Sequence, residues 1–320
     1  MPLNEWLRGA PIRPHLVHGS VVAVATPFRD GALDLAALAR LCERQINRGT
    51  TALVVCGSTG EAPALSAAEQ SQVVRVAAEV ASNRVPIIAG CSGTSTEAAV
   101  ALATAAARCG ASGLLCAPPP YVKPTQEGIC AHVRAVFQAA DLPVMLYDVP
   151  SRVGVAIADA TVAKLFHQGS IAALKDATAD LSRPPRLRAM CGQDFVQMTG
   201  DDATAAAYRA MGGNGCVSVT ANLTPALCSA LHRAWEDGDL AGFARIRDLL
   251  DPLHAALFAE SNPIPLKAAL AALSLCSDEL RLPLTGGTAS TRERLVQVLA
   301  GIMPAEEEAA SMMAKLRAAA

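Results

Sequence analysis

The chain has 320 residues, of which 52% are hydrophobic, and a formal net charge of −2. This length fits one large α/β domain or two smaller ones, and without a basic excess the chain is not expected to bind nucleic acid. The ten cysteines occur singly and form no C-x-x-C pair. This pattern predicts reduced, mostly buried thiols in a cytoplasmic protein, not a secreted disulfide framework.

The first eighteen residues contain several prolines and arginines but no apolar run long enough for a signal peptide. We interpret residues 1–18 as an irregular extension. No stretch of the chain reaches the roughly 18 uncharged apolar residues that a membrane span needs. The sequence therefore predicts a protein without a membrane anchor.

From residue 19 onward, short apolar runs alternate with helical patterns. Asp34, Ser66 and Thr94 are predicted to begin helices. Ser66 with Glu69, and Thr94 with Glu97, have the three-residue spacing of a capping box. Eight runs have the length and composition of strands: Val21–Pro27, Ala52–Cys56, Pro86–Gly90, Gly113–Ala117, Val144–Val149, Ile171–Asp176, Phe195–Thr199 and Cys216–Thr220.

After the eighth run, the chain is predicted to be helical from Pro225 to about Ala300, with breaks at 262–265 and 282–284 where prolines cluster. Strands joined by helices at intervals of roughly 20 to 35 residues favour an α/β fold of the (β/α)8 TIM barrel type. We assign the barrel to residues 19–223 and a C-terminal helical appendage to residues 224–320. A doubly wound open sheet is the alternative, but no G-x-G-x-x-G follows the first strand.

The active site of such a barrel forms at the carboxyl ends of its strands. Tyr147 and Lys175 end the fifth and sixth predicted strands, and Arg152 follows the fifth. Ser58 and Tyr121 follow the second and fourth strands. If the fifth and sixth strands are parallel neighbours, Tyr147 and Lys175 lie at the same depth.

Lys175 is the candidate nucleophile because it follows a run of apolar residues. Desolvation lowers the pKa of an ammonium group, and only a neutral amine attacks a carbonyl to form a Schiff base. The alternative is a solvated charge or a partner for Asp176. Tyrosines such as Tyr121 and Tyr147 often serve only core packing, but paired hydroxyls at strand ends could move protons, with Ser58 as a relay.

The segment Gly57–Gly60 is either a simple tight turn or a site where backbone N–H groups approach a small carboxylate. Arg152 is either a surface charge or a bidentate partner for a second carboxylate. Asp201 and Asp202 either hold a metal or cap a helix, and we predict the helix cap. The histidines occur singly in helical patterns, at His132, His167, His232 and His254, so we expect neither a metal nor another cofactor.

Taken together, the motifs resemble those of the dihydrodipicolinate synthase family, within the pyruvate-dependent class I aldolases and lyases. The resemblance extends from about Gly19 to Val298 and rests on the segments 57–61, 147–152, 174–178, 200–202, 218–222 and 262–265. It implies condensation of pyruvate with L-aspartate 4-semialdehyde to 4-hydroxy-tetrahydrodipicolinate, on the route to diaminopimelate and lysine. It also implies assembly as a dimer of dimers, a homotetramer.

The resemblance assigns roles to individual residues. Lys175 would carry a covalent pyruvate imine, Tyr147 would transfer its proton, and Ser58 would connect to a Tyr121 contributed by the partner subunit. Thr59, together with Gly57 of the same segment, would hold the pyruvate carboxylate, and Arg152 would hold the carboxylate of the semialdehyde. Val217 is expected among the residues that line the substrate site.

The sequence departs from the family pattern in three places. Ser58 stands where threonine is usual and keeps the hydroxyl, whereas Asp148 replaces an asparagine with an acid whose effect the sequence does not predict. The positions that bind lysine in feedback-regulated members are Ala67, Gln70 and Pro120 here. We therefore expect weak inhibition by lysine, or none.

Two other functions are compatible with the sequence. Another pyruvate-dependent aldolase, such as N-acetylneuraminate lyase or a 2-keto-3-deoxy sugar-acid aldolase, would share Lys175 and Tyr147 but differ around the second substrate. A catalytically silent relative that binds an oxo acid would share the fold. The complete set of Ser58, Tyr121, Tyr147 and Lys175 argues against the silent relative.

Overall fold

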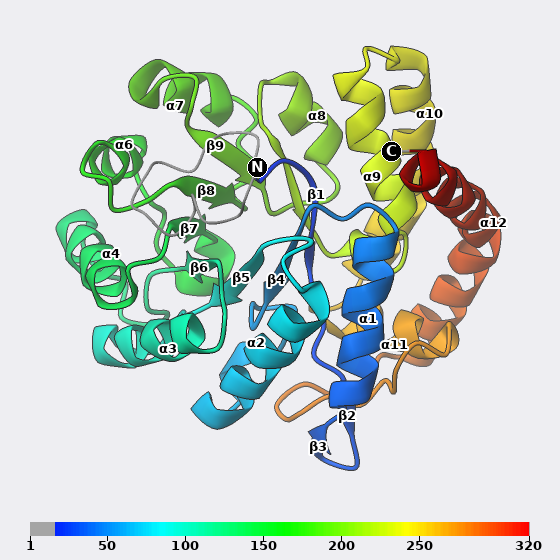
Figure 1. The fold of residues 1–320 in the computed structure, drawn as a ribbon, viewed down its shortest axis with the longest axis horizontal. Helices are drawn as coiled ribbons and strands as arrows, with labels where there is room; N and C mark the ends of the chain where they lie inside the picture. The colour runs from blue at the N-terminus through cyan, green and yellow to red at the C-terminus, as the bar shows by residue number, and fades with distance from the viewer. Residues whose placement is uncertain (1–16, 320) are drawn as a thin grey trace.

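The computed structural model describes residues 17–319. Within this range a closed barrel of parallel strands forms the centre of the protein (Figure 1). The prediction of an irregular extension concerns residues 1–16, which lie outside the described residues, and residues 17 and 18, which precede the first strand.

Each of the eight predicted strands is present, and each barrel strand pairs in parallel with its neighbours. The last strand pairs with the first, so no strand edge is left open. The predicted TIM barrel is therefore confirmed. In chain order the strands are β1 (Gly19–Ala23), β4 (Ala52–Val55), β5 (Ile87–Gly90), β6 (Gly113–Cys116), β7 (Val144–Asp148), β8 (Ala173–Asp176), β9 (Val196–Thr199) and β10 (Gly215–Ser218).

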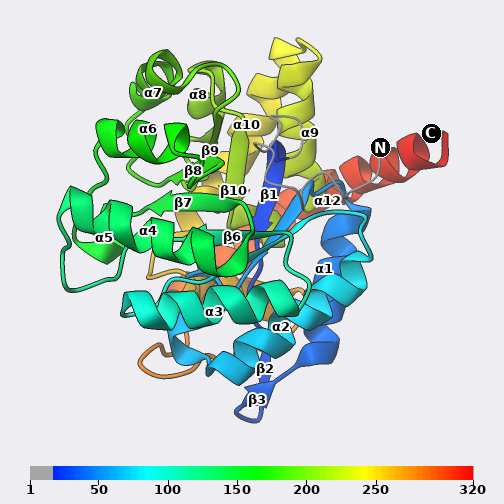
Figure 2. The same cartoon turned by 60° about the vertical axis from the view of Figure 1, so that its left-hand side comes forward.

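Helices surround the barrel on its outer side (Figure 1). Around the ring they are α1 (Leu35–Asn47), α2 (Ala67–Ala81), α3 (Thr96–Arg108), α4 (Gln126–Ala140), the short α5 (Pro150–Val153), α6 (Asp159–His167), α7 (Arg183–Cys191) and α8 (Ala205–Ala210), with the 3₁₀ turns η2 (Ala62–Ala64) and η3 (Thr220–Asn222). A small hairpin of β2 (Phe28–Arg29) and β3 (Ala32–Leu33) follows β1 and projects from the body of the protein (Figure 2). The sequence had not indicated this hairpin.

The C-terminal helices are α9 (Pro225–Glu236), α10 (Leu240–Leu257), α11 (Ile264–Ala272) and α12 (Ala289–Ala319). Helix α9 packs against β1, while α10, α11 and α12 gather at one side of the barrel (Figure 1). The predicted breaks at 262–265 and 282–284 lie between these helices. The division of the chain at residue 223 stays a prediction.

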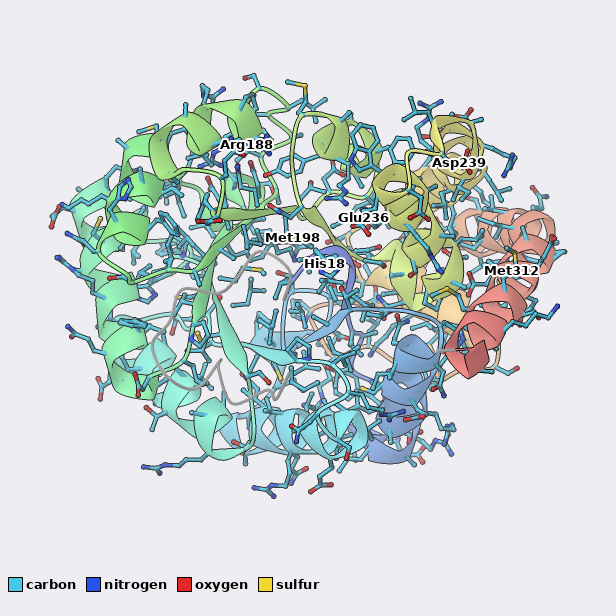
Figure 3. The ribbon with its side chains drawn as sticks, turned by 45° about the horizontal axis from the view of Figure 1, so that its top comes forward. His18, Arg188, Met198, Glu236, Asp239 and Met312 are labelled. Atoms are coloured by element: carbon cyan, nitrogen blue, oxygen red, sulfur yellow. The ribbon has the colours of Figure 1, made fainter. Side chains whose placement is uncertain are left out.

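Alternation of side chains along the strands divides the core into two layers. In β4, Val54 faces the inside of the barrel, whereas Leu53 and Val55 face the surrounding helices. Figure 3 shows Met198 of β9 near the middle of the ring and Met312 of α12 at its outer side. The cysteines are free and most of them are buried, as predicted, and no helix among residues 17–319 is long and apolar enough to cross a membrane.

Two of the predicted helix starts are confirmed. The Asp34 carboxylate accepts a hydrogen bond from the N–H of Ala37, and Ser66 and Glu69 form a complete capping box. The prediction for α3 was wrong by one residue, because the Ser95 hydroxyl accepts the bond from the N–H of Ala98. Thr94 precedes the helix and plays no part in the cap.

The prediction that Asp201 and Asp202 cap the next helix was wrong. Helix α8 begins at Ala205 without a side-chain cap. The Asp202 carboxylate instead accepts hydrogen bonds from the N–H groups of Val219, at 2.8 Å, and Thr220, at 3.3 Å. Asp202 therefore holds the turn that follows β10.

Glu306 connects α12 to α9 and to the end of α1 through buried polar contacts. Its carboxylate is fully buried and accepts hydrogen bonds from the N–H groups of Ala226, at 3.2 Å, and Leu227, at 2.9 Å, in the first turn of α9. Arg48, at the end of α1, forms an ion pair with it at 2.9 Å. Burial raises the pKa of Glu306, and the hydrogen bonds and the arginine oppose that shift.

We predict that Glu306→Gln lowers the free energy of unfolding by about 2 kcal/mol, because it removes the charge from the bond with Arg48 and places an amide NH2 against the N–H groups of α9. Glu307→Gln is the matched control. Glu307 also pairs with Arg48, but its side chain is 58% exposed, so its loss should cost less than about 1 kcal/mol. Urea denaturation measures both values, and equal losses would contradict the prediction.

Candidate active site

Strands β7 and β8 bring Tyr147 and Lys175 side by side. The two residues are direct partners in the register of the parallel pair. The Lys175 Nζ atom lies 4.2 Å from the centre of the Tyr147 ring, and the two residues are only 6% and 7% exposed. The predicted equal depth and shelter of this amine and this phenol are therefore confirmed.

Gly200, directly after β9, leaves room for the lysine side chain. A Cβ atom at this position would lie 2.7 Å from Lys175 Cε, closer than such contacts allow. The Gly200 N–H also donates a hydrogen bond to the Asp176 carbonyl at 2.6 Å, which ties the loop after β9 to the end of β8. The sequence motif contains this glycine, but no local signal in the sequence assigns it a role.

The loop after β4 carries Ser58 and Thr59. Ser58 is partly exposed, whereas Thr59 is buried and its hydroxyl accepts a hydrogen bond from the Asn262 side chain at 3.0 Å. A second hydrogen bond fixes the loop, because the Thr26 hydroxyl donates to the Gly60 carbonyl at 2.7 Å. Gly57, which opens the loop, is also partly buried.

A buried ion pair supports the same loop from its far end. Glu61, whose backbone is left-handed at φ 52°, lies 2.6 Å from the Lys267 Nζ atom. Both side chains are almost completely buried, and Lys267 also donates to the Glu279 carbonyl and lies over the Phe28 ring. Burial lowers the pKa of Lys267, and Glu61 opposes that shift. Sequence reasoning missed this pair, since a single lysine two residues after Pro265 gives no local sign of burial.

Arg152 lies in the short helix α5, directly after β7, and is exposed. Its Nη2 atom donates to the Asn262 carbonyl at 3.1 Å. Asn262 therefore contacts both Arg152, through its backbone, and Thr59, through its side chain. The sequence motif included Asn262 but did not indicate that it joins these two residues.

The model of the dihydrodipicolinate synthetase family matches residues 16–302. A 4-hydroxy-tetrahydrodipicolinate synthase from Rhodospirillum centenum is 47% identical over 278 residues, which cover 87% of this chain and 96% of that protein. The chain belongs to the dihydrodipicolinate synthetase family. It is therefore an enzyme of the lyase and synthase type, as predicted.

Solved structures of the family agree with this result. The synthase from Acinetobacter baumannii, inhibited by chloride and complexed with pyruvate, has a TM-score of 0.86 at 39% identity, and the match covers 89% of this chain and 98% of that one. The synthase from Aquifex aeolicus has a TM-score of 0.86 at 38% identity, over 89% and 97% of the two chains. The predicted synthase function is confirmed at the family level, and cleavage of sialic or sugar acids is not favoured.

Two of the predicted site residues remain to be described. Val217 of β10 is fully buried and belongs to the inner layer of the barrel, together with Tyr147. Tyr121 follows β6, has a left-handed backbone at φ 75°, and is 95% exposed. In a single chain its phenol is therefore in solvent, and its predicted connection to Ser58 stays a prediction.

The described residues contain no cluster of three histidine, cysteine, aspartate or glutamate side chains arranged to hold a metal ion. The four histidines that were expected singly in helices lie on separate helices: His132 in α4, His167 in α6, His232 in α9 and His254 in α10.

We predict that Gly200→Ala lowers kcat by about 100-fold, because the added methyl group displaces the Lys175 amine by roughly 1 Å. The backbone at Gly200 is not left-handed, so the effect is steric. Gly301→Ala, in an open position on α12, is the control and should keep full activity. Steady-state kinetics measures both variants, and unchanged turnover in Gly200→Ala would contradict the assignment.

Proposed function

We propose that the protein condenses pyruvate with L-aspartate 4-semialdehyde to 4-hydroxy-tetrahydrodipicolinate through an imine formed on Lys175. The observation that carries this proposal is the sheltered amine of Lys175 against the ring of Tyr147. The amine attacks the carbonyl carbon of pyruvate, and loss of water from the carbinolamine gives the imine. The synthase from Acinetobacter baumannii was solved with pyruvate, which supports this first substrate.

The later steps need a carbon nucleophile and a proton carrier. Loss of a methyl proton from the imine gives an enamine, which attacks the aldehyde carbon of the semialdehyde. The amino group of the semialdehyde then displaces Lys175 and closes the ring, so that one water is released overall. Tyr147, whose ring lies beside the amine, would give and take these protons through its phenol.

The remaining site residues bind and orient the substrates. Thr59, held by Asn262, and the backbone of the Gly57 loop would bind the pyruvate carboxylate, and Val217 would line the inner wall. Arg152 would bind the carboxylate of the semialdehyde through a charge-assisted hydrogen bond. In this scheme the covalent pyruvate imine on Lys175 does the work of a cofactor, so none is required.

We further propose that Tyr121 acts in a second copy of the chain, within a dimer of dimers. An aromatic side chain that is 95% exposed on a left-handed backbone is costly for a single chain, and contact with a second subunit would bury it. Val122, the next residue, is also exposed at 62%. Ser58 of one subunit and Tyr121 of its partner would then complete the proton relay.

We predict that borohydride reduction in the presence of pyruvate converts Lys175 of the wild-type protein to a secondary amine, which adds the mass of pyruvate plus two hydrogens less one water. The Lys175→Ala variant should show neither adduct nor turnover. Lys164→Ala, which removes an exposed lysine paired with Glu127, is the control and should form the adduct normally. Mass spectrometry of the intact protein and its peptides gives the result, and an adduct on another lysine would refute the mechanism.

We predict that Arg152→Ala raises KM for the semialdehyde by about 10- to 100-fold, the range expected for a lost hydrogen bond to a charged group. The KM for pyruvate should change little, because Thr59 and its neighbours bind that substrate. Steady-state kinetics with each substrate varied in turn separates the two. Equal increases in both KM values would show that Arg152 does not select the second substrate.

We predict half-maximal inhibition only above about millimolar L-lysine, which corresponds to weak binding. The Gln70 amide already donates to the Ala62 carbonyl at 3.2 Å and, more weakly, to that of Leu65. Ala67 and Pro120 offer neither a charge nor a side-chain hydrogen bond. Titration of lysine in the steady-state assay measures the effect, and inhibition below millimolar would contradict this expectation.

A further inference from the structure

Directly behind the reactive pair lies a second pair of residues, Asp148 and Asp176. They follow Tyr147 and Lys175 in sequence and are also direct partners in the strand register. Since successive side chains of a strand point to opposite faces, both carboxylates point away from the barrel interior, toward the helices. They are 0% and 1% exposed. The sequence had left the effect of Asp148 open.

Arg183, the first residue of α7, reaches both carboxylates. Its Nη1 atom lies 2.7 Å from Asp148 Oδ2 and 3.3 Å from Asp176 Oδ1. Its Nη2 atom donates to the Ile157 carbonyl at 2.7 Å, and its Nε atom pairs with Asp159 at 2.9 Å. The Arg183 side chain is 3% exposed. One guanidinium therefore connects β7, β8, α7 and the start of α6.

The carboxylates also bind the backbone beyond the strands. Asp148 accepts hydrogen bonds from the Ile157 N–H at 3.2 and 3.3 Å. Asp176 Oδ1 accepts from the N–H of Thr178, at 2.9 Å, and from its hydroxyl, at 2.7 Å. The segments that leave β7 and β8 are thus fixed to the strand ends that carry Tyr147 and Lys175.

This arrangement is unfavourable if it serves stability alone, because burying charged groups removes their hydration. Two buried carboxylates share one buried guanidinium, and replacing such a cluster with apolar side chains is often neutral or stabilising. Burial raises the pKa of Asp148, and Arg183 is the main opposing influence. A cluster of directional charge-assisted bonds does, however, fix geometry more strictly than apolar packing does.

We infer that Arg183 is a positioning residue that, through Asp148 and Asp176, holds the ends of β7 and β8 in register and so keeps Tyr147 beside Lys175. The inference rests on the proposed roles of that lysine and that tyrosine. Proton transfer between the phenol and the imine depends steeply on their separation, and a misplacement of about 1 Å costs roughly 100-fold in rate. Arg183 itself touches no substrate in this account.

The test compares Arg183→Met with Arg186→Met. Arg186 lies one turn further along α7 and pairs with Asp159 and Asp180 at the surface, with a side chain that is 45% exposed. Arg183→Met should lower kcat by about 30- to 100-fold while KM for pyruvate changes less than about threefold. Arg183→Lys, which keeps the charge, should recover part of kcat, and Arg186→Met should leave both constants unchanged.

A second set of variants keeps the test decisive if Arg183→Met does not fold. Asp148→Leu keeps a similar side-chain volume but removes every hydrogen bond to Arg183, and should lower kcat about 5- to 10-fold with KM nearly unchanged. Asp180→Leu, which removes a surface partner of Arg186, is its control. If both Arg183→Met and Asp148→Leu are soluble, their combination should be no worse than Arg183→Met alone, because Arg183→Met already removes the contact with Asp148.

Circular dichroism and thermal melting identify the folded variants, and borohydride trapping of the wild-type protein is measured alongside. Wild-type kcat in folded Arg183→Met, or in Asp148→Leu if the former is unfolded, would overturn the inference and leave Arg183 a structural residue. Absence of a pyruvate adduct on wild-type Lys175 would instead overturn the proposed mechanism. The two failures are therefore distinguishable.

Discussion

The pairing of β7 with β8 is the constraint on which the candidate site depends. In this register Tyr147 faces Lys175 inside the barrel, and Asp148 faces Asp176 outside it. Because side chains alternate along a strand, a shift of either strand by one residue would exchange an inner residue for an outer one. The phenol would then leave the amine, and a carboxylate would enter the apolar interior. Both the chemistry and the stability of the barrel thus require the same register.

Buried ion pairs secure the joints between segments that are distant in sequence. Lys267 of α11 pairs with Glu61 in the loop after β4, and Glu306 of α12 pairs with Arg48 at the end of α1. Arg183 does the same for β7 and β8. A charge without its partner is very unfavourable in such positions, so each pair permits one arrangement of the joined elements and penalises others. The C-terminal helices contribute in this way to a site that lies in the barrel.

Much of this architecture could be predicted from the sequence, because strand length, helix caps and strand-end residues are local signals. The eight strands, the Asp34 cap and the register of Tyr147 with Lys175 follow from such signals. The errors occurred where two neighbouring residues have the same capping chemistry, as Thr94 and Ser95 do, or where a side chain bonds to another element, as Asp202 does. Long-range ion pairs, such as that of Lys267, leave no periodic pattern in the sequence.

The contacts of Glu306 on α12 have a practical consequence for truncating this protein. The region that matches the family ends at residue 302, whereas the carboxylate that joins α9, α1 and α12 belongs to Glu306. A shortened gene whose product stops at the family boundary would keep every residue of the proposed chemistry. It would nevertheless leave the first turn of α9 uncapped and Arg48 without its buried counter-charge. Family boundaries are therefore poor guides to where this polypeptide can be cut.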